Sequence, residues 1–297
     1  MNDALQLRAE SRSSLIAVVL DLNPLAWGFK AAQDAQRTSK SESFVQALDA
    51  TLTFISSYLL MTHGNQVVVV GAHPLGAEIL HPTNEYSGNT ASMVNRQIEA
   101  KINDLCRSTL LDDSITDVST SPSSRFNNAL SKALCCINRM KSDKSNMPAR
   151  LLVLKCGGDF LSHQYLPLIN CAYAAEHLKV SIDAVVLEAE VDIPVFQQMV
   201  DVTGGVYSRV TEPATLLQTL LTYHLPDDDA RKILSKVPST PVDSRAVCFK
   251  TRTVTDIGYV CSVCLSVYKM LTPICITCKT VLKLPGMPPS RKRKREK

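Results

Sequence analysis

Four short apolar runs, each about the length of one strand, constrain the fold of this chain of 297 residues more than any other feature. The first reads Leu-Ile-Ala-Val-Val-Leu and ends in Asp21. The four runs occupy residues 15–20, 66–71, 150–155 and 180–187. Strands in the middle of a parallel sheet are buried on both faces, so their sequence is mostly apolar rather than alternating. The runs therefore predict a buried parallel sheet.

Amphipathic helical patterns separate these runs. Between Phe44 and Leu59, apolar residues recur every three or four positions and form one stripe. Comparable patterns predict helices at about residues 93–111, 126–140, 164–178, 193–202 and 213–224. Short strands are expected at 77–80 and 206–210, and polar loops at 25–40 and 112–124. Strands that alternate with helices predict an α/β domain over about residues 12–225, built on a doubly wound, mostly parallel sheet.

Two Cys-x-x-Cys pairs stand ten residues apart near the end of the chain: Cys261 with Cys264, and Cys275 with Cys278. Two such pairs can bring four thiolates to one tetrahedral zinc ion. The surrounding segment is too short to build a sufficient hydrophobic core, and zinc binding can supply the missing stability. We therefore predict a four-cysteine module at residues 246–286 with one structural Zn²⁺. A site closed by four thiolates has no open position for catalysis.

Other roles for the ten cysteines remain open at this stage. The two pairs would alternatively be unrelated buried thiols or a redox Cys-x-x-Cys. Cys248 lacks a partner at the spacing of a metal knuckle, so a buried thiol is the simpler interpretation. Core thiols are expected at Cys106, Cys135, Cys136, Cys156 and Cys171.

A basic tail ends the chain. Its run of basic residues is Arg291, Lys292, Arg293, Lys294 and Arg295, followed by Glu296 and Lys297. Six basic and one acidic side chain give this tail more charge than the formal +4 of the whole chain, so the rest is nearly neutral. Such a run is typical of a nuclear-import signal, with weak DNA contact or simple solubilisation as alternatives. A neutral body argues against a broad nucleic-acid-binding face.

The remaining boundaries follow from composition. Residues 226–245 hold three prolines and the acidic run Asp227–Asp229, and we expect a linker there with a possible short helix. Residues 287–297 form the expected disordered basic tail. The polar residues 1–12 do not resemble a secretory signal, and no apolar stretch approaches 18 residues, so a membrane span is not expected. We expect reduced thiols and a nuclear location.

No enzyme class is supported. The chain has no Gly-x-x-x-x-Gly-Lys-Ser/Thr phosphate loop and no dinucleotide fingerprint, and no nucleophile is marked beside a histidine. The six histidines lack metal-ligand spacing, so each is expected to be a surface or satisfied loop residue. We expect no catalytic residue and no small-molecule substrate.

The end of the first strand resembles a von Willebrand A domain, in which this strand ends in an Asp-x-Ser-x-Ser metal motif. Here the corresponding residues run from Asp21 to Leu25 as Asp-Leu-Asn-Pro-Leu, and Leu25 cannot bind a metal. The loop after Leu154 runs from Lys155 to Asp159 as Lys-Cys-Gly-Gly-Asp, where a metal-binding version would place an acid directly at the strand end. Mg²⁺ binding is therefore unlikely, and Asp21 is expected to cap or hydrogen-bond its loop.

Nearly the whole chain resembles the smaller von Willebrand A-type subunits of the general transcription and DNA-repair factor TFIIH. The resemblance rests on the order of the following pieces: Ser14–Leu25, Cys156-Gly-Gly-Asp159, Thr203-Gly-Gly-Val-Tyr207, Gly258-Tyr-Val-Cys-Ser-Val-Cys264 and Pro273-Ile-Cys-Ile-Thr-Cys278. It implies a non-catalytic scaffold that pairs with the larger, RING-bearing von Willebrand A subunit and other TFIIH core subunits. It also implies roles in transcription by RNA polymerase II and in nucleotide excision repair.

Two other functions remain to be distinguished. A zinc-ribbon nucleic-acid-binding factor would need basic and aromatic side chains around the knuckles. Residues 257–284 offer only Lys269, Lys279 and Lys283 with two tyrosines, so contact with nucleic acid is expected to be indirect or weak. A metal-dependent adhesion domain is disfavoured by Leu25 and by the absence of an apparent secretion signal.

Overall fold

The computed structural model describes residues 13–38, 43–82, 91–110, 124–143, 147–157, 161, 164–187, 192–234, 242–251 and 253–281. The chain separates into two compact units, Met1–Asp243 and Ser244–Lys297. The basic tail at 291–297 lies outside the described residues, so its role as an import signal stays a prediction. The domain boundaries expected from the sequence likewise stay a prediction.

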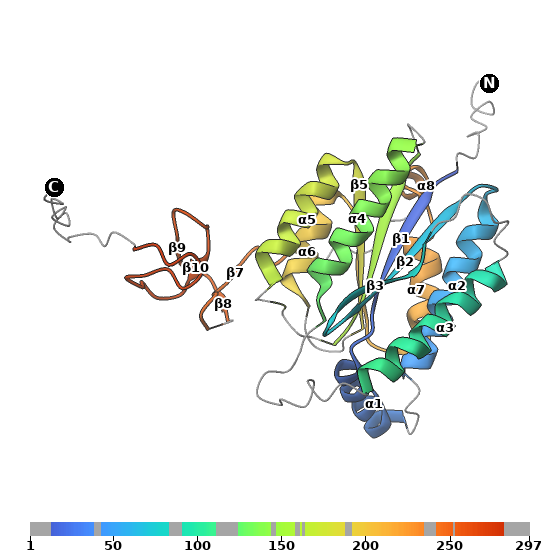
Figure 1. Ribbon diagram of the computed structural model, residues 1–297, viewed down its shortest axis with the longest axis horizontal. Coiled ribbons are helices and arrows are strands. Elements are labelled where there is room, and N and C mark those ends of the chain that lie inside the picture. The colour runs from blue at the N-terminus through green and yellow to red at the C-terminus, as the bar shows by residue number, and fades with distance from the viewer. Residues whose placement is uncertain are drawn as a thin grey trace, which may run out of the picture. The chain divides into compact units, whose positions relative to one another are not determined.

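The first unit is built on a six-stranded sheet with the order β3-β2-β1-β4-β5-β6 (Figure 1). The strands are β1 (Leu15–Asp21), β2 (Gln66–His73), β3 (Gly76–His81), β4 (Ala149–Cys156), β5 (Val180–Leu187) and β6 (Tyr207–Val210). All neighbouring pairs are parallel except β2 and β3, which form an antiparallel hairpin at one edge. This confirms the expected α/β fold built on a mostly parallel sheet.

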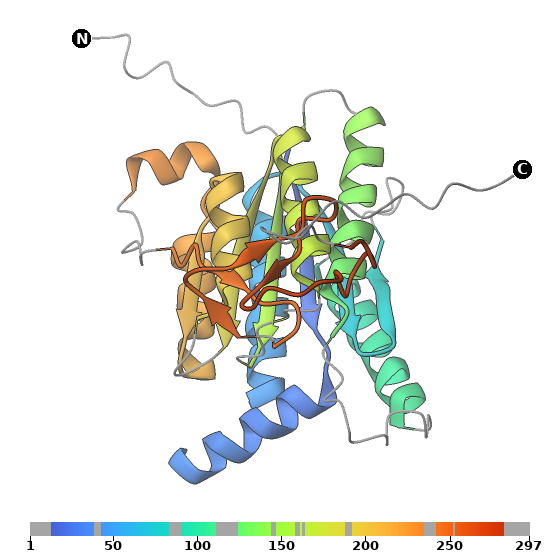
Figure 2. The same cartoon turned by 90° about the vertical axis from the view of Figure 1, so that its left-hand side faces the viewer.

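Helices cover both faces of the sheet, which explains the continuous apolar strands (Figures 1 and 2). The helices of the first unit are α1 (Pro24–Thr38), α2 (Ser43–Met61), α3 (Ala91–Leu110), α4 (Phe126–Asp143), α5 (Tyr165–His177), α6 (Pro194–Thr203), α7 (Leu216–Thr219) and α8 (Asp228–Ile233). Ala17 and Val19 of β1 face a core shared with α4, α5 and α6. Ile16 and Val18 face the opposite core, shared with α2, α3 and α7. Because side chains alternate along a strand, one apolar run serves two cores.

The helix α2 is apolar and, among the described residues, alone long enough to cross a membrane by length and composition. The sequence expectation had found no apolar stretch of that length. In this structure Phe54, Ile55 and Tyr58 of α2 are buried in the core against the sheet. Apolar side chains of α2 therefore pack in the core of the first unit.

The expected polar loop at 25–40 is wrong over most of its length, because α1 begins at Pro24. The side chain of Asn23 accepts a hydrogen bond from the amide of Leu25 at 3.1 Å. Asn before Pro at the first helical position is a helix-start signal, since proline's missing N–H has no partner to lose there. Figure 2 shows α1, in dark blue, projecting beyond the end of the sheet.

The expected helix at 213–224 is irregular. It starts as a 3₁₀ turn at Pro213–Thr215, continues as α7 and ends as a π-helical turn at Leu220–His224. His224 is fully buried, and its Nε2 lies 3.0 Å from Ser208 Oγ. His81 is also buried and pairs with Gln97. The expectation of surface or loop histidines is therefore wrong for these two.

Two glycines permit the turn between α6 and β6. Gly204 has a φ of 69°, in the left-handed region, and ends α6. A Cβ on Gly205 would lie 2.0 Å from the carbonyl oxygen of Ile182 on β5. Only glycine allows the backbone to approach this closely.

Part of the expected linker is folded onto the first unit. Asp227 caps α8 by accepting a hydrogen bond from the amide of Ala230, as expected for the acidic run. Arg231 on α8 holds the buried Asp183 of β5 through both guanidinium nitrogens, at 3.0 and 2.5 Å. Burial alone would raise the pKa of Asp183, but the neighbouring His224 and Arg231 lower it below its usual range. The start of the linker is thus fixed by a buried ion pair.

The core-thiol expectation holds for some cysteines and fails for others. Cys156 and Cys171 are buried, as expected. Cys136 is half-buried, whereas Cys106 and Cys135 are exposed. The last two lie on solvent-facing positions of α3 and α4, where an apolar-looking residue does not have to point inward.

The second unit contains very little regular structure. Its strands are β7 (Ala246–Val247), β8 (Val254–Thr255), β9 (Tyr259–Val260) and β10 (Val267–Tyr268). They form two antiparallel pairs, β7 with β8 and β9 with β10. Its only cluster of buried residues among those described consists of Cys261, Tyr268 and Cys275. The interior of this unit is therefore made largely of the side chains of the two Cys-x-x-Cys pairs.

Candidate metal centre

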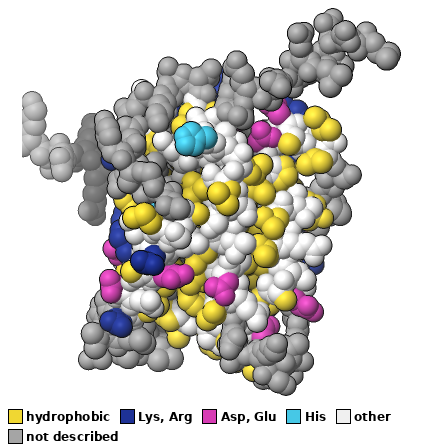
Figure 3. All heavy atoms as spheres, turned by 90° about the vertical axis from the view of Figure 1, so that its right-hand side faces the viewer, with side chains coloured by type: hydrophobic (Ala, Val, Ile, Leu, Met, Phe, Trp, Pro, Cys, Tyr) yellow, Lys and Arg dark blue, Asp and Glu magenta, His cyan; other side chains and the backbone are white. Residues whose placement is uncertain are grey.

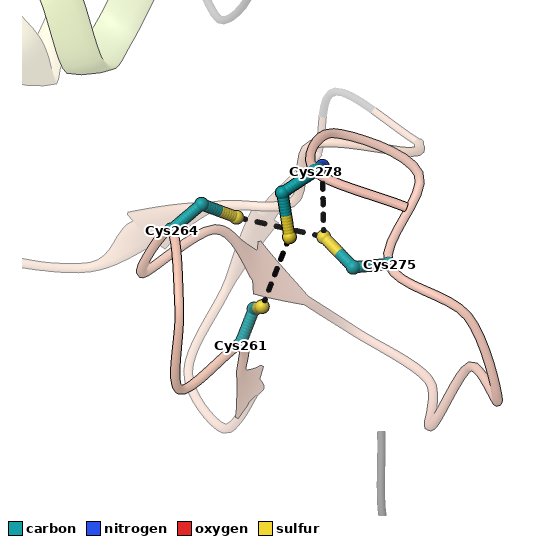
Figure 4. A group of neighbouring side chains, drawn as sticks. All are labelled: Cys261, Cys264, Cys275 and Cys278. Carbon is teal, nitrogen blue, oxygen red and sulfur yellow. Dashed lines mark hydrogen bonds between the residues drawn. The ribbon is translucent and has the colours of Figure 1, made fainter. Parts of the chain in front are cut away.

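The four cysteines of the two pairs converge on one point (Figure 4). The sulfur atoms of Cys261, Cys264, Cys275 and Cys278 all lie within 4.8 Å of one another. Across the two pairs, Cys261 Sγ is 3.7 Å from Cys278 Sγ, and Cys264 Sγ is 3.5 Å from Cys275 Sγ. Two of the sulfurs are buried and two are partly exposed. The spacing seen in the sequence therefore does bring the four thiols together.

These distances match a tetrahedral metal site better than a disulfide. With Zn–S bonds of about 2.3 Å, the edge of a regular tetrahedron is about 3.8 Å. A disulfide would bring two sulfurs to about 2.05 Å. The observed separations of 3.5 and 3.7 Å lie near the first value. Four thiols in this arrangement can hold one metal ion, and soft sulfur ligands favour zinc among the common candidates.

The two pairs sit in turns of the same geometry. In the first turn, the amide of Leu265 donates to the carbonyl of Cys261, and in the second the amide of Lys279 donates to that of Cys275, both at 2.9 Å. Leu265 and Lys279 both adopt a left-handed backbone, with φ of 59° and 61°. Few non-glycine residues take this conformation. The repeated geometry indicates that each turn is shaped to present two sulfurs in the same direction.

Three side chains that the sequence did not single out support these turns. Tyr268 is 1% exposed, and its hydroxyl lies 3.2 Å from Cys275 Sγ and 3.1 Å from Thr277 Oγ1. Ser266 Oγ lies 3.1 Å from Cys264 Sγ and donates to Thr277 Oγ1 at 3.0 Å. Ser266 thus links the first turn to the second, and the second turn is supported by Tyr268. An isolated aromatic residue between two metal-binding pairs is the signal that would have found it.

The local contacts favour the thiolate at Cys275 and Cys264 but not at Cys261. The amides of Cys264 and Val263 lower the pKa of Cys261, but burial and the sulfurs of Cys264 and Cys278 outweigh them and raise it. Burial raises the pKa of the Cys275 thiol, but the Cys278 amide and the Tyr268 hydroxyl, together with the neighbouring sulfurs, lower it to about 5. The hydroxyl of Ser266 lowers the pKa of Cys264. Because the thiolate is the form that binds a metal, these contacts prepare the site for a cation.

Cys248 begins a third turn that resembles the other two. Its amide donates to the carbonyl of Thr253, five residues on, as those of Cys261 and Cys275 do to Ser266 and Thr280. Thr251 stands where the second cysteine of a pair would stand. Cys248 is buried, as expected, and its sulfur accepts a hydrogen bond from the amide of Lys269 at 3.2 Å. This turn carries only one cysteine, and Cys248 is not part of the four-cysteine cluster.

The end of β1, where the sequence suggested a lost metal motif, is also built from hydrogen bonds. Asp21 is buried and accepts a hydrogen bond from the amide of Asn23 at 3.2 Å, as expected of a loop-capping residue. It also lies 3.4 Å from the ammonium of Lys155. Leu25, which replaces a ligand in the motif, is partly exposed on α1.

Comparisons with known proteins cover both units. The family described as transcription factor Tfb4 matches residues 13–279. The chain is 32% identical over 279 residues to the general transcription and DNA repair factor IIH subunit tfb4 of Schizosaccharomyces pombe, covering 92% of this chain and 90% of that protein. It is 30% identical to general transcription factor IIH subunit 3 of Dictyostelium discoideum, covering 83% of this chain and 71% of the relative.

A solved structure gives an independent comparison. The crystal structure of the TFIIH p34 N-terminal domain is similar to this chain with a TM-score of 0.56 and 26% sequence identity. The match covers 71% of this chain and 97% of that domain.

Proposed function

The chain belongs to the transcription factor Tfb4 family, and from this premise we propose that it is a non-catalytic scaffold subunit of the TFIIH core. The proposal follows from the names of its relatives and from the chemistry of its candidate site. Four converging thiols with no open position suit a structural metal, not a reaction centre. Its role would then be to hold other proteins in place.

The metal in this proposal is a single structural Zn²⁺ held by Cys261, Cys264, Cys275 and Cys278. The observed sulfur separations and the hydrogen bonds that favour the thiolate at Cys275 support this assignment. The second unit has hardly any hydrophobic interior of its own. Zinc binding, with apparent free energies of about 10–16 kcal/mol in small zinc-dependent domains, would therefore supply most of its stability.

The observation that carries the scaffold proposal is the apolar surface of the second unit. Most of its large apolar side chains face outward rather than inward. The exposed set is Ile257, Tyr259, Val260, Val263, Leu265, Met270, Leu271, Ile274, Ile276 and Val281. Apolar surface of this density on a small module marks a protein contact. We call this set the apolar surface of the zinc module.

The charge of this module favours a protein partner over DNA. Around the two Cys-x-x-Cys pairs, from residue 257 to 281, the only charged side chains are Lys269 and Lys279. The other charged residues of the module, Lys250, Arg252, Asp256 and Lys283, lie outside this stretch. DNA binding requires clustered lysine and arginine to neutralise phosphates. A surface that is apolar and nearly uncharged instead fits the apolar face of another subunit.

The first unit offers a second apolar region. Figure 3, which views the side of α2 and α3, shows apolar side chains spread across that face, with a few acidic and basic groups among them. The exposed apolar residues of these two helices are Val45, Leu60, Met61 and Met93. A subunit held within an assembly can use more than one such face, so this region is a further candidate contact.

In this proposal, the principal partner is the larger, RING-bearing von Willebrand A subunit, and the assembly acts in RNA polymerase II transcription and nucleotide excision repair. The relatives' names, which join transcription and DNA repair, support these processes. The location is then the nucleus. The basic residues Arg291 to Arg295 are the proposed import signal.

The test is affinity purification of the tagged full chain from nuclear extract, with the co-purifying proteins identified by mass spectrometry. We expect the TFIIH core, including the larger von Willebrand A subunit, in near-stoichiometric amounts. Recovery of the chain alone, or with DNA only, would contradict the scaffold proposal and favour a zinc-ribbon nucleic-acid-binding factor.

A matched pair of variants tests the apolar surface itself. Val263 and Ser262 are adjacent and exposed within the same Cys-x-x-Cys turn. Val263→Glu places a charge on the apolar surface, whereas Ser262→Glu places the same charge on an already polar position. We expect Val263→Glu to lose co-purifying subunits and Ser262→Glu to retain them, with zinc content equal in both. Equal recovery in the two variants would remove the apolar surface from the proposed interface.

A further inference from the structure

A buried lysine stands at the carboxyl ends of the central strands β1 and β4, where the fold family implies a metal ion. The side chains of Lys155 and Asp21 are 3% and 1% exposed, and Lys155 Nζ lies 3.4 Å from Asp21 Oδ2. Charged side chains are almost never buried this fully without a specific set of partners. The partners of Lys155 and Asp21 must therefore explain how both charges are buried.

The carboxylate of Asp21 is fully used by hydrogen-bond donors. Its Oδ1 accepts from Ser124 Oγ at 2.5 Å and from the amide of Asn23 at 3.2 Å. Its Oδ2 accepts from the amide of Cys156 at 3.2 Å and from Lys155 Nζ at 3.4 Å. A carboxylate offers about four lone-pair sites, so these four donors leave none for a metal.

The ammonium of Lys155 is equally well enclosed. Besides Asp21, it donates to the carbonyl oxygen of Cys156 at 2.7 Å. On another side it lies over the ring of Phe126, with Nζ 5.7 Å from the ring centroid. A carboxylate, a carbonyl and an aromatic face are the three kinds of group that stabilise a buried cation. The site is thus built around a positive charge that the chain itself supplies.

We propose that the Lys155 ammonium is the resident cation of this strand-end site and takes the place of a divalent metal. Mg²⁺ requires near-octahedral oxygen coordination at about 2.0–2.1 Å, whereas the position beside Asp21 Oδ2 is already occupied by the positively charged Lys155 ammonium. The residues therefore do not fit Mg²⁺. The sequence expectation against Mg²⁺ rested on a different ground, namely that Leu25 cannot bind a metal.

The substitution changes what this edge of the sheet can do. A divalent ion bound by one carboxylate keeps positive charge and an open position for an acidic ligand. The Asp21–Lys155 pair is neutral and closed. Any partner that contacts this edge must then bind without a bridging metal, so its binding should not depend on divalent cations.

A built-in probe makes the proposal testable in the full chain. Trp27 is the only tryptophan, and its Nε1 donates to the carbonyl oxygen of Asp21 at 2.8 Å. Tb³⁺ prefers oxygen ligands and luminesces when a nearby tryptophan is excited. We expect no Tb³⁺ luminescence from the wild type. Lys155→Ala should give a saturable signal that Mg²⁺ or Ca²⁺ suppresses, and D21N/K155A should lose it.

The outcomes separate clearly. Luminescence from the wild type that Asp21→Asn abolishes would overturn the proposal, because a metal would then share the site with the ammonium. A folded Lys155→Ala variant that stays silent would overturn it as well, because the site would not be a cation site. Lys155→Arg keeps the positive charge and should stay silent like the wild type.

A double-mutant cycle keeps the proposal falsifiable if Lys155→Ala folds poorly. Urea unfolding of the first unit is followed by Trp27 fluorescence in the wild type, Asp21→Asn, Lys155→Met and D21N/K155M. If the Lys155 ammonium stabilises the buried Asp21 carboxylate, removing the ammonium alone leaves that charge unpaired. D21N/K155M should then be more stable than Lys155→Met, with a coupling of at least about tenfold in the unfolding equilibrium constant. Additive effects of the two substitutions would overturn the proposal.

Discussion

The two units of this chain are stabilised in opposite ways. The first unit buries apolar side chains on both faces of a six-stranded sheet, in two separate cores. Among its described residues, the second buries only three cysteines, one tyrosine and two hydroxyl side chains, and it leaves most of its apolar side chains exposed. Burial of apolar area stabilises the first, whereas bonds to a metal would stabilise the second. Apolar residues in the second unit are thus left available for contacts with other proteins.

The largest expected effect tests whether the units are stabilised independently. Cys261→Ser or Cys278→Ser removes one of four thiolates, so the second unit should lose its zinc and unfold. The first unit should keep its unfolding transition because its cores contain none of these residues. Zinc content by atomic absorption and Trp27 fluorescence during urea unfolding measure the two units separately.

Two other cysteines provide controls for that experiment. Cys106 is exposed on α3, and Cys248 lies in the third turn outside the cluster. Cys106→Ser and Cys248→Ser should both leave zinc content at about one ion per chain. Zinc retention equal to the wild type in Cys261→Ser and Cys278→Ser would refute the four-cysteine site.

The reverse experiment should damage only the first unit. In Gly205→Ala the new Cβ would meet the Ile182 carbonyl oxygen, so β5 or the α6–β6 turn must shift. We expect a loss of about 3 kcal/mol in the unfolding free energy of the first unit, at the upper end of the usual cost of overpacking. Zinc content should not change. Gly28→Ala, at a helical position with open space, should be neutral or slightly stabilising.

The sequence predicts some features of the two units and not others. The convergence of the four cysteines was predictable because their spacing determines which sulfurs can meet. The strands were predictable because burial on both faces leaves a continuous apolar run. The order of strands in the sheet was not, since it depends on contacts between segments far apart in the chain.

The errors have definite physical causes. The helix α1 was mistaken for a loop because Asn before Pro also ends a strand, although Asn23 and Pro24 carry the helix-start signal here. His224 was expected near the surface because a sequence does not show which polar residue will pair with a buried acid such as Asp183. The role of Lys155 was likewise invisible, since its partners Asp21 and Phe126 are distant in sequence.

A smaller effect concerns the attachment of α8 to the first unit. Arg231→Met removes the paired guanidinium but leaves Asp183 its hydrogen bond from the Val206 amide. We expect the first unit to lose about 2 kcal/mol, the scale of hydrogen bonds to charged groups. Amide exchange in α8 should accelerate more than exchange in the sheet. Lys232→Met, which removes a fully exposed partner of Asp229, is the control and should have little effect.

The same ion pair predicts a dependence on pH. The folded pKa of Asp183 lies below its ordinary value near 3.9. Its stabilising contribution is therefore fully present above about pH 4 and is lost as the pH falls through the lower folded pKa. Unfolding of the first unit measured between pH 7 and pH 2 should show this loss in the wild type. The profile should be flatter in Asp183→Asn, and identical profiles would contradict the assignment.

The smallest expected effect concerns the backbone strain in the Cys-x-x-Cys turns of the second unit. Lys279 holds a left-handed backbone with φ of 61°, which costs about 1–2 kcal/mol for a residue with a Cβ. Glycine removes this cost but has more freedom when unfolded, so Lys279→Gly should stabilise the second unit by only about 1 kcal/mol. Lys279→Ala removes the same side chain while keeping the Cβ, and should give no gain. Competition with a zinc chelator measures the difference, because a less strained turn should retain the metal longer. Equal retention in the glycine and alanine variants would mean that the metal–sulfur bonds, and not the backbone, determine the stability of the turn.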